Sequence, residues 1–301
     1  MPRKGPNEAP SVRRTRIAIR SLRLTLLRLL LAALLVLSMP SGAAADPQIP
    51  NFWDLKERFP KPQLGNLQRL RFLTTVDFPP FNFIDANGDL TGFHVDLVRR
   101  ICAELEVTPV CQIQAVPWNE LESTLANGGG EAIVAGLAIT AETRGKYAFS
   151  RPYLRFPARF VMPKSSAVTE PLAAKLDGRR IGVLKDSAHE RMLRAFFPKV
   201  QPVVYGRQQW LYGDLREGKL DGVFGDGMRL SFWLAGNDSA GCCRFAGGPY
   251  MAPNQLGHGL AIAVPHDNPQ LADAFNYALR ELQANGGFAE LYLRYFPVSF
   301  Y

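Results

Sequence analysis

The sequence lacks the motifs of several common enzyme and metal sites. It contains no HExxH motif, and the glycine run GGGEA at 128–132 is not followed by the Lys-Ser/Thr of a phosphate-binding loop. No Ser-His-Asp order of a nucleophilic triad is recognisable. The four cysteines form no CxxC pair, whereas a structural zinc site of this kind uses two. We therefore expect neither a metal nor a cofactor.

The sequence also lacks an apolar run long enough to cross a bilayer. The uninterrupted segment from Leu29 to Leu37 is well short of the ~20 residues that span a membrane. It follows an arginine-rich opening and precedes Gly42-Ala43-Ala44-Ala45, which resembles an A-x-A cleavage site. We therefore expect residues 1–45 to be a secretory signal cleaved near Ala45 rather than a membrane anchor, and we expect a periplasmic protein.

A basic surplus is missing once this signal is set aside. The whole chain holds 35 Lys+Arg and 27 Asp+Glu, for a formal charge of +8. Residues 1–45 contain 8 of those Lys+Arg and 1 of those Asp+Glu, so the remainder has 27 against 26 and a charge of +1. Nucleic-acid binding needs a basic stripe, so we expect no nucleic-acid partner.

The few cysteines indicate disulfides, because an exported chain meets an oxidising compartment. Cys102 ends an apolar-periodic segment and Cys111 opens the next strand, so a tight helix-to-strand turn would bring them together. We expect that bond to stabilise the fold by roughly 2 to 3 kcal/mol. Cys242 and Cys243 are adjacent, and three states stay open for them: a vicinal disulfide, an intermolecular pair or free thiols.

Beyond residue 69, apolar strands alternate with amphipathic helices, which is typical of a mostly parallel α/β sheet. The first set has strands over 69–76, 111–116 and 132–136, and helices over 93–105 and 118–128. The second set has strands over 179–186, 202–206 and 221–226, and helices over 189–197, 208–220 and 228–236. Two helices, over 268–285 and 288–296, close the chain.

This repetition predicts two α/β lobes. Residues 46–68 are a proline-rich extended lead-in, 69–161 begin lobe 1, 162–256 form lobe 2, and 257–301 complete lobe 1 with a return strand and the C-terminal helices. The isolated strands Arg159–Pro163 and His258–Pro265 would cross between the lobes. Such an arrangement allows closure about a hinge.

Candidate binding residues follow the expected strands, because ligands of open α/β sheets bind beyond the carboxyl ends of the strands. Phe78 and Trp118 would rim one cleft and sandwich a small organic ligand. The planar guanidinium of Arg144 matches the geometry of a carboxylate, and the Asp226 carboxylate can accept hydrogen bonds from an ammonium group. The two residues together would therefore suit a zwitterion. Gly136 and Ser187 occupy equivalent places.

Other residues in the same stretches receive structural roles. Phe81 and Phe83 are expected in the core. Lys185 and Asp186 are expected to be solvated loop charges.

These stretches resemble the extracellular solute-binding proteins of family 3, the periplasmic receptors for polar amino acids in ABC importers. The resemblance covers about Arg69 to Phe296 and is carried by PPFNFIDANGDLTGFHVDL, VPWNELESTLANGGGEAIVAGLAITAETR and DGVFGDG. It implies an α/β, type II periplasmic-binding-protein fold, with two lobes joined by two crossover strands. It also implies an aromatic sandwich of Phe78 and Trp118, an α-ammonium partner in Asp226, and a short helix-to-strand disulfide like Cys102–Cys111.

The chain departs from the family pattern where a carboxylate would be held. Family members read T-x-T-x-E-R, whereas here Ala138 has lost a hydroxyl and Arg144 is displaced by one place. The usual G-T-T or G-T-G run of the second lobe is replaced by 186–189, Asp-Ser-Ala-His. Either Arg144 reaches in through a shifted turn, or the ligand is not an ordinary α-amino acid.

His94 is a further departure, because the family's helix opening GFDVDL has an Asp at this place. We expect it to be a surface residue at a helix start, since no partner spacing supports a metal role.

The leading hypothesis is a monomeric, non-enzymatic receptor that captures a small amine-bearing solute, an amino acid or a derivative, for an inner-membrane ABC permease. Two alternatives remain open. One is a periplasmic cyclohexadienyl-dehydratase-like enzyme on the same fold, with Glu142 or Asp226 as general acid. The other is a sensory or accessory solute-binding protein.

Overall fold

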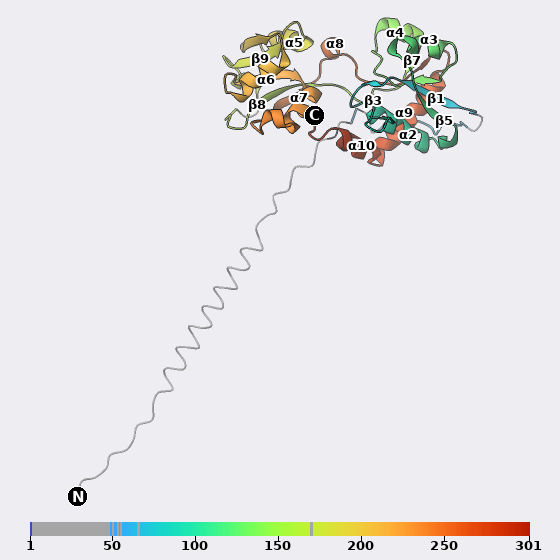
Figure 1. Ribbon diagram of the computed structural model, residues 1–301, viewed down its shortest axis with the longest axis horizontal. Coiled ribbons are helices and arrows are strands. Elements are labelled where there is room, and N and C mark those ends of the chain that lie inside the picture. Colours follow the sequence, from blue (N-terminus) through green and yellow to red (C-terminus); the bar gives the residue numbers. More distant parts are fainter. Residues whose placement is uncertain (2–48, 50, 53, 55, 65–66, 169–170) are drawn as a thin grey trace. The chain divides into compact units, whose positions relative to one another are not determined.

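The computed structural model describes residues 1, 49, 51–52, 54, 56–64, 67–168 and 171–301 (Figure 1). The predicted signal and its cleavage near Ala45 therefore lie outside the described residues, apart from Met1. In the described part, no helix combines the length and the apolar character that a membrane crossing requires.

The described strands include one five-stranded sheet that contains β1. Its order is β5 (Cys111–Ala115), β1 (Leu70–Thr74), β6 (Ala132–Ile133), β13 (Ala263–Pro265) and β7 (Tyr147–Phe149). β5 and β6 pair with β1 in parallel, whereas β13 runs antiparallel to β6 and β7. Four of the five β1 residues are buried, as expected of a central strand covered on both faces.

A second five-stranded sheet of the described part contains β11. Its order is β10 (Gln201–Tyr205), β9 (Arg180–Leu184), β11 (Gly222–Asp226), β8 (Ala158–Pro163) and β12 (Cys243–Tyr250). β9 pairs in parallel with β10 and β11, but β8 runs antiparallel to β11 and β12. In each sheet four strands therefore run in one direction and one strand, β13 or β8, is reversed. The expectation of mostly parallel α/β sheets is confirmed, but the single reversed strand was not predicted, because an apolar run does not encode the direction of its strand.

Helices cover both sheets in the described residues (Figure 1). They are α2 (Phe93–Glu104), α3 (Leu121–Ala126), α4 (Ala141–Lys146), α5 (Ala188–Phe196), α6 (Gln208–Arg216), α7 (Gly227–Ala235), α8 (Pro253–Leu256), α9 (Pro269–Ala284) and α10 (Gly287–Tyr295). Short 3-10 turns are η1 (Thr108–Val110), η2 (Trp118–Glu120), η3 (Ala173–Lys175) and η4 (Asn237–Ser239). α5, α6 and α7 pack on the second sheet, and α2, α3 and α9 on the first.

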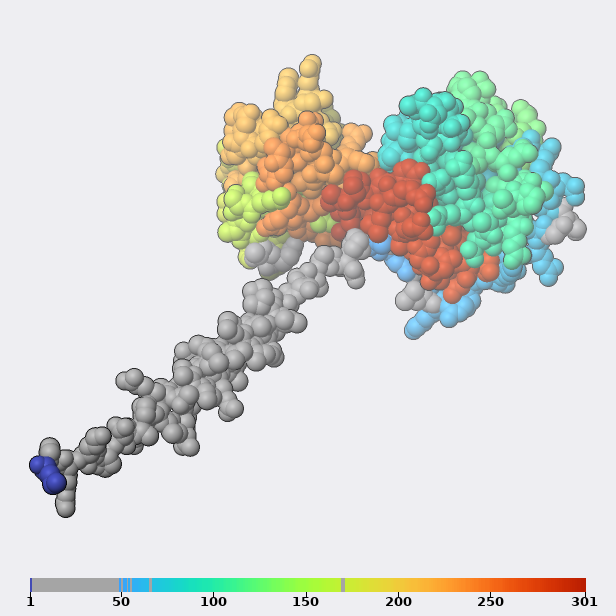
Figure 2. Space-filling view, turned by 60° about the horizontal axis from the view of Figure 1, so that its bottom comes forward, coloured from blue at the N-terminus to red at the C-terminus, as the bar shows by residue number. Residues whose placement is uncertain are grey.

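The C-terminal helices belong with the first sheet. In Figure 2 the C-terminal residues, in red, lie against the part of the surface that α2 contributes. Asp96 of α2 accepts hydrogen bonds from the Arg294 guanidinium at 3.1 Å and from the Tyr295 hydroxyl at 2.8 Å. Leu279 and Phe288 are buried in the same core as Leu97. Residues nearly 200 positions apart thus build one hydrophobic core.

The chain passes between the two sheets twice, after β7 and after β12. The two passages meet at Leu154 and Leu260, which form an isolated antiparallel bridge. Leu260 N–H donates to Leu154 O at 2.7 Å, and Tyr153 N–H donates to Leu260 O at 2.9 Å. β8 lies wholly in the second sheet. The lobe limits named above, which would divide β8, stay a prediction.

Both cysteine pairs are bonded. Cys102 and Cys111 form the expected disulfide, with their Cα atoms 6.3 Å apart. Cys242 and Cys243 form the vicinal disulfide, one of the three states that the sequence left open.

The expectation of a surface position for His94 was wrong. Its side chain is fully buried under Phe81 and Phe93. Nδ1 bonds with Asn82 Oδ1 at 2.8 Å and Nε2 with the Tyr153 hydroxyl at 2.9 Å. Burial lowers the pKa of His94 to about 3, so the ring is neutral at physiological pH. A histidine is tolerated here because both ring nitrogens have partners.

Candidate ligand-binding site

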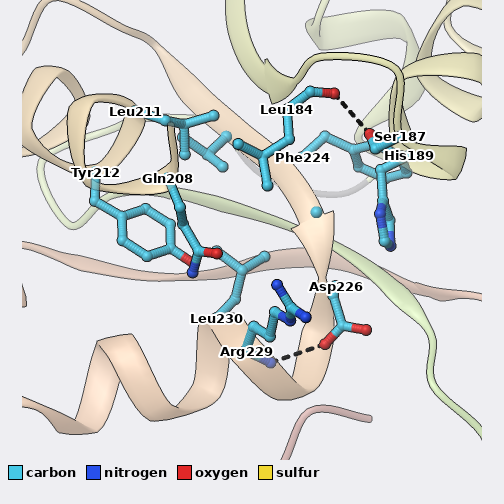
Figure 3. Close-up of a pocket in the computed structure, with 12 residues that line it drawn as sticks. Leu184, Ser187, His189, Gln208, Leu211, Tyr212, Phe224, Asp226, Arg229 and Leu230 are labelled. Carbon is cyan, nitrogen blue, oxygen red and sulfur yellow. Dashed lines mark hydrogen bonds between the residues drawn. The ribbon is translucent and has the colours of Figure 1, made fainter. Parts of the chain in front are cut away.

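A cavity of about 220 Å³ lies at the carboxyl edge of the second sheet (Figure 3). Its lining residues come from the ends of β9 and β11 and from the helices that follow: Leu184, Ser187, His189, Gln208, Leu211, Tyr212, Val223, Phe224, Gly225, Asp226, Arg229 and Leu230. The leucines and Phe224 give it an apolar floor.

Two of the predicted site residues, Ser187 and Asp226, meet in this cavity. Each caps the helix that follows its strand. The Ser187 hydroxyl donates to Leu184 O at 2.7 Å and accepts from Glu190 N–H at 3.0 Å. Asp226 Oδ1 accepts from Arg229 N–H at 2.8 Å. They converge because β9 and β11 are parallel neighbours, so their carboxyl ends share one edge of the sheet.

Gln208 and Tyr212 also line the cavity, and neither residue was predicted from the sequence. They lie on α6, which follows β10, the parallel neighbour of β9. The Gln208 amide donates to the Tyr212 hydroxyl at 2.6 Å, and the Tyr212 ring stacks on Trp233 with centroids 4.6 Å apart. Applying the strand-end rule to β10, the second strand of the second set, would have found Gln208.

His189 lies beside Asp226 in the cavity wall. Burial lowers the pKa of the His189 imidazole, the Asp226 carboxylate raises it and the Arg229 guanidinium lowers it, with burial the largest influence. Its Nε2 atom is buried and has no hydrogen-bond partner among the described residues. The lowered pKa favours the neutral ring, whose Nε2 atom has a hydrogen-bonding capacity that no described residue uses.

Phe78 and Gly136 contact each other on the first sheet's side of the chain. Phe78, half-buried, stacks on Phe81 with ring centroids 4.7 Å apart. Gly136 has φ +81°, and a Cβ on it would lie 2.9 Å from Phe78 Cε1. Glycine therefore lets the backbone approach the ring closely. Phe81 is buried as expected, whereas Phe83 is only half-buried.

Trp118 is 52% exposed. It lines a shallow hollow of about 330 Å³ with Asp77 and Pro117. Asp77 precedes Phe78, so both aromatic residues lie at the same end of the first sheet. Their action on one ligand together with Asp226 stays a prediction, because the 220 Å³ cavity is lined only by residues 184–230.

Arg144 lies in the last turn of α4 and is exposed. α4 begins with a capping box in which Thr140 and Thr143 bond reciprocally, at 2.9 and 3.1 Å. The Thr143 hydroxyl is held in this cap and also donates to Ala138 O at 2.7 Å. Glu142, the other candidate acid, is exposed and pairs with Lys146 at 3.2 Å. This is not the buried setting that a general acid with a raised pKa needs.

Comparison with known sequences agrees with the resemblance noted above. Residues 70–298 match the profile of the bacterial extracellular solute-binding proteins, family 3. ABC transporter arginine-binding protein 1 of Escherichia coli is 30% identical over 230 residues, which cover 76% of this chain and 91% of that protein. The L-arginine-binding protein of Pseudomonas aeruginosa is 30% identical over 271 residues, 89% of this chain and 95% of that protein.

Among solved structures, the unliganded open L-cystine solute receptor of Neisseria gonorrhoeae has a TM-score of 0.66 at 19% identity. The match covers 78% of this chain and 95% of the receptor. At this identity the likeness concerns the fold, and it confirms the type II periplasmic-binding-protein architecture.

Proposed function

Because the chain belongs to the bacterial extracellular solute-binding proteins of family 3, we propose that it is a periplasmic receptor for an amino acid or a related amine. It would deliver this solute to an ABC permease of the inner membrane. Relatives that are named as ABC transporter and L-arginine-binding proteins, and that align over most of both chains, support this proposal.

The observation that carries the proposal is the setting of Asp226. Its Oδ1 atom is held by the first turn of α7, so the carboxylate has a fixed orientation at the cavity. A half-buried carboxylate beside an apolar floor can form a charge-assisted hydrogen bond with an ammonium group. Ser187, His189 and Gln208 add polar groups that would orient the rest of the solute.

Closure would complete the site. The part of the chain before the first passage between the sheets contains Phe78, Trp118 and Gly136. The part between the two passages contains Ser187 and Asp226. A rotation at the Leu154–Leu260 bridge would bring the two sets over one ligand, and the solute's preference for the closed form would drive that rotation.

Calorimetry with the purified protein tests the proposal. The protein is unfolded, dialysed to remove retained solute and refolded, and is then titrated with each of the twenty L-amino acids and with putrescine. We expect saturable binding of at least one α-amino acid with one site per chain. A flat response to every compound would contradict the proposal.

Localisation and assembly are tested separately. Mass spectrometry of the protein recovered from the periplasmic fraction should give a first residue near Asp46, and light scattering should give a monomer. Radiolabelled uptake of the calorimetric ligand should fall when the gene is deleted. Unchanged uptake would favour a sensory role over import.

A further inference from the structure

Arg229 lines the same cavity as Asp226, three residues further along the chain. Asp226 is the N-cap of α7, and Arg229 lies in the first turn of that helix. Figure 3 shows the Arg229 side chain extending into the cavity on the same side as the Asp226 carboxylate. One helix start thus presents an acid and a base to one small space.

The Arg229 guanidinium is free to bind a ligand. In the described part of the chain, its guanidinium makes no hydrogen bond and no ion pair, even with Asp226, whose carboxylate is bonded by the Arg229 backbone N–H instead. Other arginines of this half of the chain are engaged: Arg194 pairs with Glu190 and Arg216 donates to Asp238 O. Burial raises the pKa of Tyr212 to about 12 and lowers the pKa of His189, and the charge of the nearby Arg229 guanidinium acts in the lowering direction on both groups.

The charges in the cavity are balanced before any ligand enters. Asp226 is the only carboxylate among the described residues that line it, and Arg229 is the only guanidinium or ammonium. A zwitterion preserves this balance, since its ammonium pairs with Asp226 and its carboxylate with Arg229. A second positive charge on the ligand would meet Arg229 without a second acid to offset it, in a space whose floor is apolar.

We propose that Arg229 holds the carboxylate of the ligand, the role that the sequence suggested for Arg144, and that the ligand is a zwitterion whose side chain carries no positive charge. This inference rests on the proposed function, because it concerns the same site. The start of α7 also presents backbone N–H groups and the positive end of a helix, both of which favour an anion there.

The inference separates this chain from its relatives that are named as arginine-binding proteins. Leu184, Leu211 and Leu230 would contact the ligand side chain, and the Gln208 amide and Tyr212 hydroxyl would bond a polar group at its end. Uncharged side chains of moderate length fit this lining better than a guanidinium does.

The test uses pairs of amino acids that match in length and differ in charge: L-arginine with L-citrulline, L-lysine with L-norleucine, and L-glutamate with L-glutamine. Calorimetric titrations are run on the wild-type protein, on Arg229→Met, and on Arg216→Met as an exposed arginine control at the end of α6. Thermal unfolding without ligand checks that each variant is folded.

We expect citrulline to bind at least tenfold more tightly than arginine, and norleucine than lysine, to the wild-type protein. Arg229→Met should weaken the binding of the tightest ligand at least tenfold. It should also reduce the difference in affinity between the two members of each pair. Arg216→Met should change neither. Tightest binding of arginine or lysine, or an affinity unchanged in Arg229→Met, would overturn the inference while leaving the receptor function in place. Absence of binding by all six probes and all other amino acids would overturn both.

Discussion

Asp226 accepts a 2.8 Å hydrogen bond from the backbone N–H of Arg229, so the carboxylate that faces the cavity also caps α7. The carboxylate therefore has a structural role, and the proposed binding role concerns the same group of atoms. The two roles are separable, because asparagine caps a helix about as well as aspartate but carries no charge.

Asp226→Asn should leave stability nearly unchanged and abolish most of the affinity. We expect a loss of roughly 2 to 5 kcal/mol of binding free energy, since the ligand's ammonium would be buried without its counter-charge. Asp226→Ala should lose the same affinity and, in addition, about 1 kcal/mol of stability with the cap. Calorimetry and urea unfolding measure the two effects. Affinity that survives in both variants would place the ammonium elsewhere.

His94 should make the fold sensitive to mild acid. The native ring has a pKa of about 3 and the unfolded chain an ordinary value of 6.5, so only the unfolded state gains a proton between these values. The free energy of unfolding should therefore fall as pH decreases below 6.5, by up to about 1.4 kcal/mol per pH unit from this group. Above pH 6.5 both states are neutral and the contribution is flat.

The variant His94→Gln isolates this contribution. Urea unfolding of the wild type and the variant at pH 7.5, 6.0 and 5.0 should show a shallower decline for the variant, while the contribution of the carboxylates is common to both proteins. Equal slopes from pH 6.0 to 5.0 would mean that His94 gains its proton in the native state.

Gly136→Ala should perturb Phe78. The new methyl group would lie 2.9 Å from Phe78 Cε1, and φ +81° is a strained conformation for alanine. We expect a loss of about 1 to 2 kcal/mol in stability. We also expect a lower affinity for the ligand, because the Phe78 ring would be displaced. Gly145→Ala is the matched control, because nothing lies within 4 Å of a Cβ there and Gly145 is inside α4. Unchanged stability and affinity in Gly136→Ala would show that the Phe78 ring can move aside without a loss of free energy.

Removing the Cys102–Cys111 bond should destabilise the first half of the fold. The bond closes a loop with a sequence separation of 9, worth roughly 2 to 3 kcal/mol of unfolded-state entropy. Urea unfolding of the double alanine variant should reveal that loss. The double alanine variant of Cys242 and Cys243 should lose less, because that bond closes almost no loop. A larger loss from the vicinal pair would point to a packing role instead.

Much of the local structure was predictable, because the periodicity of apolar residues distinguishes helices from strands within a short segment. The predicted helix over 93–105 corresponds to α2, and the strands expected over 202–206 and 221–226 correspond to β10 and β11 within one residue. β12 was missed, since Gly247, Gly248 and Pro249 interrupt its pattern. The pairing of β8 against β11 was beyond prediction, because register and direction depend on partners far away in sequence.

Of the site, the strand-end rule identified Ser187 and Asp226 but not Arg229 or Tyr212. Arg229 and Tyr212 lie within helices, where only the direction of the side chain decides whether a residue faces solvent or cavity. The predicted surface position of His94 was wrong for a related reason. A polar residue at a helix start is expected to be exposed unless its buried partners, here Asn82 and Tyr153, are known.

The sequence by itself determined which segments form strands and helices, that Cys102 and Cys111 pair, and that an acid stands at the end of the strand before α7. Those properties depend on near neighbours, on periodicity and on short loops. The tertiary structure alone decided that Arg229 and not Arg144 shares a cavity with Asp226, and that His94 is neutral. The first depends on the direction of a side chain within α7, and the second depends on burial among residues far apart in the chain. No local pattern encodes either of them.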